Sequence, residues 1–281
     1  MKLFKLFFTK ISINIFGFRL PIKYVLFNYL YKIFVIKNNV PQELKSFDED
    51  GYCKLDVNLK TEIEFLMKDI KLSKKDKKGR QEFELDENKK RQIYNILKRK
   101  LNKNLINFEK YFNLPINLAS LKLFRIENEL NDNYDLKDEF YSRNFHNDSY
   151  VMNYFKIFIN LQDINNHDGP TNFISKKNNK KFINLARYYN RDNYNEKKAN
   201  HLIKKNIGKI GDCFAMSTTL CFHRASVPTG KRDMMILTLV ALPKINNNEV
   251  NFNNAYIRMA KPYNFFQISK LGMNCFKKKL S

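Results

Sequence analysis

Phe145-His146-Asn147-Asp148-Ser149 is the most informative segment of this chain. If it is a strand, residues i and i+2 project from one face, so His146 and Asp148 can share a small ion. A distant histidine, His223, can supply a third ligand. Two histidines and one carboxylate on one side of a metal, with the other side open, form the facial triad of non-haem iron(II) sites. The pattern therefore predicts a metal site with open positions.

Further segments follow the H-x-D motif in an order that one chance tripeptide does not produce. They are the apolar strand 154–163, Asp168-Gly-Pro-Thr-Asn-Phe-Ile-Ser175, Gly208-Lys-Ile-Gly-Asp-Cys-Phe-Ala215, Phe222-His-Arg-Ala-Ser226 and Gly230-Lys-Arg-Asp233. This order resembles the phytanoyl-CoA dioxygenase-like branch of the 2-oxoglutarate- and iron(II)-dependent oxygenases. The resemblance runs from about residue 44 to about residue 243, beginning with Leu44-Lys-Ser-Phe-Asp-Glu-Asp-Gly-Tyr52. Its specific part is the set His146, Asp148, Gly169-Pro170, Gly211-Asp212, His223 and Arg232.

The resemblance implies a mainly β fold with flanking helices (α+β), built on a double-stranded β-helix, or jelly roll. It implies that iron(II) is held by His146, Asp148 and His223. Arg232 would grip the distal carboxylate of 2-oxoglutarate, with Thr171 or Ser217 as helpers, because a guanidinium fork matches a carboxylate with two hydrogen bonds. Gly169 and Gly211 would make tight turns, with Asp212 capping its turn rather than binding metal.

The reaction implied is hydroxylation of an unactivated C–H bond with 2-oxoglutarate and dioxygen as co-substrates. Halogenation is disfavoured because Asp148 is present, where a halogenase of this type has a small residue. Ser175-Lys-Lys replaces the frequent Gly-Ser-His of this family, which puts the substrate side in doubt. The expected substrate is a small or lipid- or sugar-linked metabolite, and the basic composition of the chain favours an anionic one.

Other interpretations stay open at this stage. His223 alone could be a core histidine bonded to a backbone carbonyl, and Arg232 could be a surface cation. A non-catalytic jelly-roll binding protein would need a broken triad or a missing arginine, and the sequence shows neither. A basic membrane-surface adaptor predicts salt-sensitive binding and no metal.

Length and cysteine content limit the organisation. The 281 residues can bury one core, and residues 38–281 are predicted to form one oxygenase domain with helical additions. Its four cysteines, Cys53, Cys213, Cys221 and Cys275, show no C-x-x-C pair. We interpret them as reduced thiols of a cytoplasmic protein.

The net charge of +23 and the isoelectric point near 9.7 have two explanations. Such a charge attracts nucleic acid, anionic membranes or acidic small molecules. The excess of lysine over arginine, with abundant asparagine and isoleucine, is equally what an AT-rich coding sequence produces. No arginine-rich stripe or known nucleic-acid-binding pattern is present, so no specific nucleic acid is expected. The basic run 74–80 is interpreted as a solvated loop.

Residues 1–37 combine aromatic and aliphatic residues with lysines and contain no acidic residue. Charged residues and a proline interrupt every apolar run before it reaches the roughly 18 residues of a membrane span. A cleavage site for a signal peptide is also missing. Two interpretations remain: short helices packed on the catalytic domain, or a basic aromatic surface that lies on an anionic inner membrane leaflet.

Hydrophobic periodicity predicts helices over 1–36, 41–50, 60–70 and 86–113, the last starting at Asp86 as N-cap. Its apolar face would contain Ile93, Leu97, Leu101, Leu105, Phe108 and Phe112. Strands are expected near 118–127, 151–161, 171–174, 213–218, 221–226 and 232–242. Residues 176–206 look like an insertion, either a lid or a disordered loop. If it is a lid, its candidate substrate contacts are Arg187, Tyr188, Tyr189 and Arg191.

Overall fold

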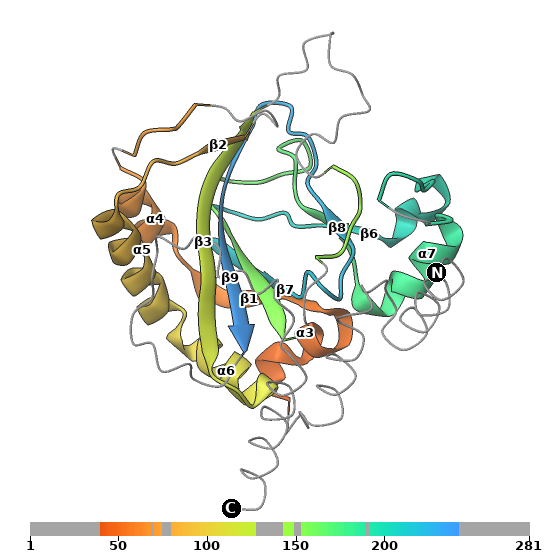
Figure 1. Ribbon diagram of the computed structural model, residues 1–281, viewed down its shortest axis with the longest axis horizontal. Coiled ribbons are helices and arrows are strands. Elements are labelled where there is room, and N and C mark those ends of the chain that lie inside the picture. The colour runs from red at the N-terminus through yellow and green to blue at the C-terminus, as the bar shows by residue number, and fades with distance from the viewer. Residues whose placement is uncertain are drawn as a thin grey trace, which may run out of the picture.

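Two antiparallel sheets face each other in the computed structural model, which describes residues 40–68, 70–74, 80–127, 143–148, 153–188 and 191–241. The large sheet has the order β1-β7-β4-β9-β3-β2 (Figure 1). Its strands are β1 (Tyr52–Asn58), β2 (Arg80–Glu82), β3 (Ile116–Glu127), β4 (Tyr154–Asn160), β7 (Asp212–Met216) and β9 (Lys231–Ala241). The small sheet has the order β6-β5-β8, with β5 (Asn172–Ile174), β6 (Ile203–Lys205) and β8 (His223–Arg224). This arrangement is the expected double-stranded β-helix.

Alternation along the strands creates an inner and an outer face. On β9, Met234 and Ile236 belong to an apolar cluster that also contains Phe173 of the small sheet, so they face the space between the sheets. Met235 and Leu237 belong to the larger cluster on the other face. Because successive side chains of a strand point to opposite faces, Arg232 shares the inner face with Met234. The sheets are therefore joined by an apolar interior that carries a few charged groups.

Helices cover the outer face of the large sheet. They are the short η1 (Gln42–Leu44) with α3 (Lys45–Asp50), then α4 (Lys60–Leu66), α5 (Glu87–Lys100) and α6 (Asn102–Phe112). Asp86 caps α5 as predicted, because its Oδ1 accepts from the Lys89 amide at 2.7 Å. The predicted single helix over 86–113 is two helices, with Leu101 as the cap of both. Its apolar face is confirmed, since all six predicted residues pack in the outer cluster.

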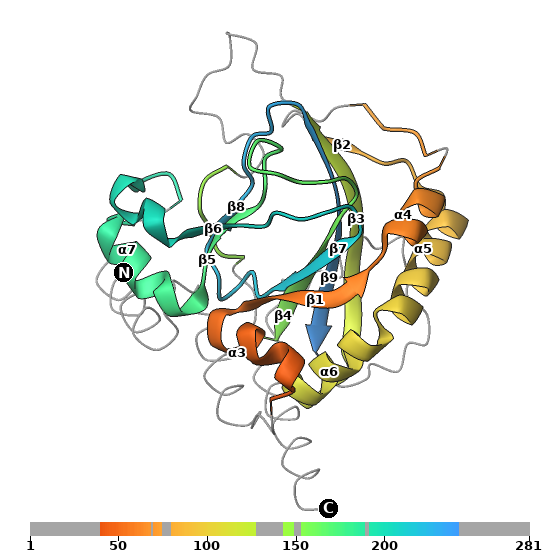
Figure 2. The ribbon, with the colours of Figure 1, turned by 180° about the vertical axis from the view of Figure 1, so that it is seen from behind.

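The described parts of the segment 176–206, residues 176–188 and 191–206, form helical turns and a strand that pack against the small sheet. The segment contains η2 (Lys176–Asn178), α7 (Asn179–Leu185) and η3 (Lys197–Leu202) before it ends in β6. The described parts of this segment are therefore not a disordered loop, and its last residues belong to a sheet. Figure 2, the reverse view, shows α7 beside β5, β6 and β8, on the side of the molecule away from α4 and α5. An apolar cluster that includes Phe182 and Tyr188 joins it to Phe145 and Phe222.

Six of the nine strands agree with the expected ones to within a few residues. The strands β1, β2 and β6 were not expected, and Arg80, placed in a solvated loop by the sequence, begins β2. Among the described residues, no helix is long and apolar enough to cross a membrane. Residues 1–37, the rest of the basic run at 75–79, and Cys275 lie outside the described residues.

Candidate metal centre

The three predicted metal ligands come together between the sheets. The ligand atoms of His146, Asp148 and His223 all lie within 4.8 Å of one another. An isolated antiparallel bridge joins His146 to His223, with N–H···O distances of 3.0 and 2.9 Å. The Asp148 amide donates to the Thr218 carbonyl at 3.0 Å. The H-x-D segment is thus an extended stretch held at two points rather than a full strand.

Both imidazoles are oriented by the same backbone contact. Nδ1 of His146 lies 2.9 Å from the Asn144 carbonyl, and Nδ1 of His223 lies 3.2 Å from the Cys221 carbonyl. A carbonyl can only accept, so each Nδ1 carries the hydrogen and each Nε2 keeps a free lone pair. Metal-binding histidines are commonly fixed in this way by a hydrogen bond at the other ring nitrogen. The donor set is therefore two Nε2 atoms and one carboxylate.

The protonation states also suit a metal. Burial, with a smaller contribution from the charge of His146, lowers the pKa of His223 to about 3, so this imidazole is neutral at neutral pH. Burial by itself raises the pKa of Asp148, but Lys156 and His223 outweigh it and hold that pKa well below its ordinary value. The result is a neutral imidazole beside an ionised carboxylate, as a divalent cation requires.

Lys156 lies beside the metal ligands and was missed by the sequence analysis. Its Nζ is 2.7 Å from Oδ2 of Asp148, the same oxygen that lies 3.9 Å from Nε2 of His223. The side chain extends from the inner face of β4, next to Phe158 on that face. The signal in the sequence was a single lysine inside the apolar run 154–161.

The segment 176–206 holds the backbone next to His146. The Tyr188 hydroxyl donates to the Phe145 carbonyl at 2.8 Å, and the Phe145 amide donates to the Tyr194 hydroxyl at 3.0 Å. Both contacts lie one residue before the first metal ligand. Tyr188 is buried and positions this backbone, while its role as a substrate contact stays a prediction.

A second tether joins the same segment to β8. The Arg224 guanidinium makes two hydrogen bonds to the carboxylate of Glu196, at 2.7 and 3.2 Å, and lies 4.5 Å over the Phe145 ring. Arg224 directly follows His223. Of the other suggested contacts, Arg187 is exposed, Arg191 is half-buried, and Tyr189 lies outside the described residues.

Arg232 is a buried cation that has no carboxylate partner within the described ranges. Its side chain lies on β9, the residue is 2% exposed, and Nη1 donates to the Gly169 carbonyl. Nε is buried without a hydrogen-bond partner. Burial lowers the pKa of Arg232 to about 10, which still leaves it charged at neutral pH. Because a buried, unpaired charge is costly, this group fits an anionic ligand better than a purely structural role.

Thr171 and Ser217, the two expected helpers, are both buried. Thr171 is two residues from Gly169, whose carbonyl binds Arg232. Ser217 directly follows Met216, the last residue of β7. Met216 is paired with Lys156 of β4, and Lys156 is in turn paired with Thr238 of β9. At about 3.3 Å per residue, this register puts Ser217 about 20 Å along β9 from Arg232. Ser217 thus lies at the metal end of the sheet, where its Oγ has no hydrogen-bond partner.

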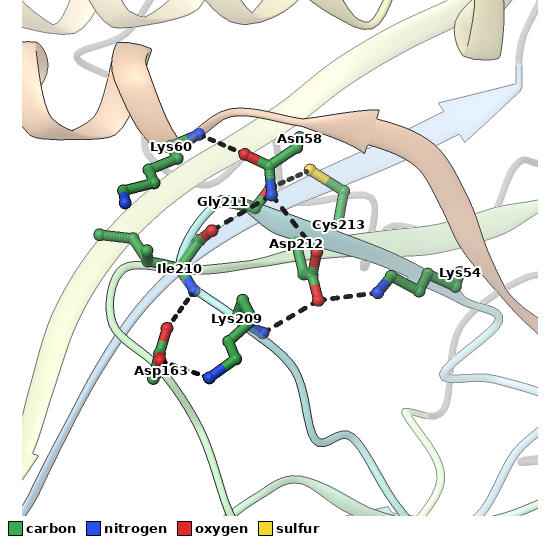
Figure 3. Close-up of polar contacts among 9 residues, drawn as sticks. All are labelled: Lys54, Asn58, Lys60, Asp163, Lys209, Ile210, Gly211, Asp212 and Cys213. Carbon is green, nitrogen blue, oxygen red and sulfur yellow. Dashed lines mark hydrogen bonds and ion pairs between the residues drawn. The ribbon is translucent and has the colours of Figure 1, made fainter.

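The two expected glycine turns are confirmed by positive φ angles of 67° at Gly169 and 84° at Gly211. Figure 3 shows the second turn, in which Oδ2 of Asp212 accepts from the Lys209 amide at 2.9 Å and from Lys54 Nζ at 2.8 Å. Asp212 therefore closes the turn, as predicted. The remaining histidines, His167 and His201, are exposed as expected.

No protein-family model matches the chain, and no curated protein matches it. Solved structures do. HygX from Streptomyces hygroscopicus, with nickel and 2-oxoglutarate bound, aligns with a TM-score of 0.50 and 13% identity over 78% of this chain and 96% of that one. EctD from S. alaskensis aligns with a TM-score of 0.47 and 15% identity, over 74% of this chain and 81% of that one. AviO1 from Streptomyces viridochromogenes aligns with a TM-score of 0.43 and 12% identity, over 74% of this chain and 100% of that one. At 13% identity, the likeness to HygX establishes a shared fold.

Proposed function

We propose that this chain is an iron(II)- and 2-oxoglutarate-dependent oxygenase that hydroxylates an unactivated C–H bond of a small molecule. The observation that carries the proposal is the joint presence of two sites in one interior. One is the cluster of His146, Asp148 and His223, whose ligand atoms lie within 4.8 Å. The other is the buried Arg232, which lacks a carboxylate partner in the part of the chain that is described. HygX, which has the same fold, was crystallised with nickel and 2-oxoglutarate.

The residues present fit iron(II). Two neutral imidazole nitrogens and one carboxylate are the donors of a facial triad, which leaves coordination positions open. The contacts of both Nδ1 atoms with backbone carbonyls fix the Nε2 atoms as the ligands. Asp148 is ionised without metal, so binding does not require it to lose a proton. We therefore assign metal binding to Nε2 of His146, Nε2 of His223 and the carboxylate of Asp148.

Arg232 fits the distal carboxylate of 2-oxoglutarate, with Thr171 as a helper. Nε of its guanidinium has no hydrogen-bond partner and is left to bind a ligand, while Nη1 donates to the Gly169 carbonyl. When bound, iron(II) and 2-oxoglutarate would activate dioxygen for attack on a C–H bond. The inner apolar cluster, which includes Phe158, Phe173 and Phe214, keeps water away from that chemistry.

Succinate formation tests this proposal. The purified chain with iron(II), 2-oxoglutarate and dioxygen should release succinate slowly even without its substrate, and His223→Ala should abolish the release. His167→Ala removes an exposed histidine and is the matched control. Equal release by the native chain and His223→Ala would reject the assignment. Metal binding without succinate from any substrate tested would favour the binding-protein alternative.

A further inference from the structure

Lys156 is a cation inside the site that the proposed reaction does not use. Its Nζ contacts the carboxylate of Asp148 at 2.7 Å. Asp148 is the only carboxylate within ion-pair distance of this lysine among the residues that the structure describes. Its side chain is 19% exposed and the carboxylate side chain that it contacts is 14% exposed, so the pair is largely removed from water. When a metal takes the charge of Asp148, Lys156 loses its counter-ion in a poorly solvated place.

From this contact we propose that the substrate carries an anionic group, a carboxylate or a phosphate, that pairs with Lys156. The inference rests on the proposed function, because it concerns the same site. The formal charges support it. Iron(II) contributes two positive charges and Arg232 one, while Asp148 contributes one negative charge and 2-oxoglutarate two, so these four groups balance. Lys156 is left over as one uncompensated positive charge, and buried charges in proteins are paired.

The position of Lys156 excludes a role at the distal carboxylate of 2-oxoglutarate. The register pairs Lys156 with Thr238, and Arg232 lies six residues further along the same strand. That separation is about 20 Å between backbones. Lys156 and Arg232 therefore stand far apart along the inner face, and only Lys156 contacts Asp148 among the described ion pairs. Arg232 serves the co-substrate, and Lys156 remains for a group of the substrate.

The test uses the full chain as its anaerobic complex with iron(II) and 2-oxoglutarate, observed through its weak visible absorption band. Inorganic phosphate and acetate are titrated separately as probes, and each dissociation constant is measured. Lys156→Met should form the same complex but bind the preferred anion at least tenfold more weakly. Lys156→Arg should bind it within about threefold of the native chain, because the charge is kept. The tighter of the two probes identifies the chemistry of the substrate group.

Lys209→Met is the matched control, because it removes the same charge from an exposed pair with Asp163, where the lysine side chain is 79% exposed. It should bind both probes like the native chain. Equal anion binding by the native chain and Lys156→Met would overturn the inference, as would a native complex that binds neither probe. Loss of the band in Lys156→Met would also overturn it, since the lysine would then serve the co-substrate. Absence of the band in the native chain would instead reject the proposed function itself.

Discussion

Replacing Arg232 by methionine should stabilise the ligand-free protein while removing its response to 2-oxoglutarate. Burial lowers the pKa of this guanidinium to about 10, and at ~1.4 kcal/mol for each pKa unit the charge costs the fold about 3 kcal/mol. Methionine fills much of the same space without a charge. The variant gives up the hydrogen bond to the Gly169 carbonyl, worth about 1 kcal/mol. The net expectation is a gain of about 1–2 kcal/mol in the free energy of unfolding.

Urea denaturation at neutral pH, with a chelator present, measures this gain. A second series contains manganese(II) and 2-oxoglutarate under anaerobic conditions. A ligand at about 100 times its dissociation constant adds roughly 2.7 kcal/mol to the stability of the native chain. Arg232→Met should show almost none of that increase from 2-oxoglutarate, although it keeps the part that manganese alone provides.

Arg125→Met is the matched control on the neighbouring strand. Arg125 donates two hydrogen bonds to Asp233, at 2.7 and 2.8 Å, so its charge is already paired. Its removal leaves a mostly buried carboxylate alone and should destabilise the protein by about 1–3 kcal/mol, without changing the response to 2-oxoglutarate. A larger destabilisation by Arg232→Met than by Arg125→Met would show that the Arg232 charge is not costly to the ligand-free fold. Full stabilisation of Arg232→Met by 2-oxoglutarate would show that Arg232 does not bind the co-substrate.

Three further predictions concern the rest of the site. Tyr188→Phe removes the hydrogen bond to the Phe145 carbonyl and should weaken iron(II) binding about tenfold or more in a metal titration, since partners that orient metal ligands commonly contribute that much. Unchanged iron(II) affinity would show that Tyr188 does not position His146. The metal-free protein should lose stability as pH falls from about 6.5 toward about 3, because the pKa of His223 is lowered in the folded state only. His223→Gln should flatten that slope in urea denaturation across pH, and an identical slope would contradict the assignment. Gly211→Ala should destabilise the protein by about 2 kcal/mol or more in thermal unfolding, because φ is 84° and an added Cβ would lie 2.3 Å from the Lys60 amide nitrogen. Gly230→Ala is the control, since a Cβ there meets nothing within 4 Å and should leave the stability unchanged.

The candidate metal ligands were predictable because metal chemistry restricts residue type and, within the H-x-D motif, spacing. His146, Asp148 and His223 are identifiable without knowing what surrounds them, and so are the glycine turns. Hydrophobic alternation and turn signals placed β4 and β9 to within a few residues. The H-x-D spacing, the glycine turns and the strand patterns are local, and such patterns survive folding because each depends on residues close in sequence. His223 is distant in sequence and was identified from the order of the motifs.

The supporting contacts were not predictable, because they join residues that are far apart in sequence. Tyr188 binds the Phe145 carbonyl across 43 residues, and no spacing rule selects that pair. The short strands β2 and β6 are three residues each, too short for periodicity to show. Lys156 stood out only as a charge in an apolar strand. The role of Lys156 depends on its contact with Asp148, which forms only when the chain folds.

Anaerobic titration of iron(II) and 2-oxoglutarate into the metal-free protein measures whether His146, Asp148 and His223 hold the metal. The native chain should develop the weak visible band of the iron(II) chelate. His223→Ala should not, while His201→Ala, which alters an exposed histidine, should behave like the native chain. No band in the native chain, or an equal band in His223→Ala, would contradict the account of this site.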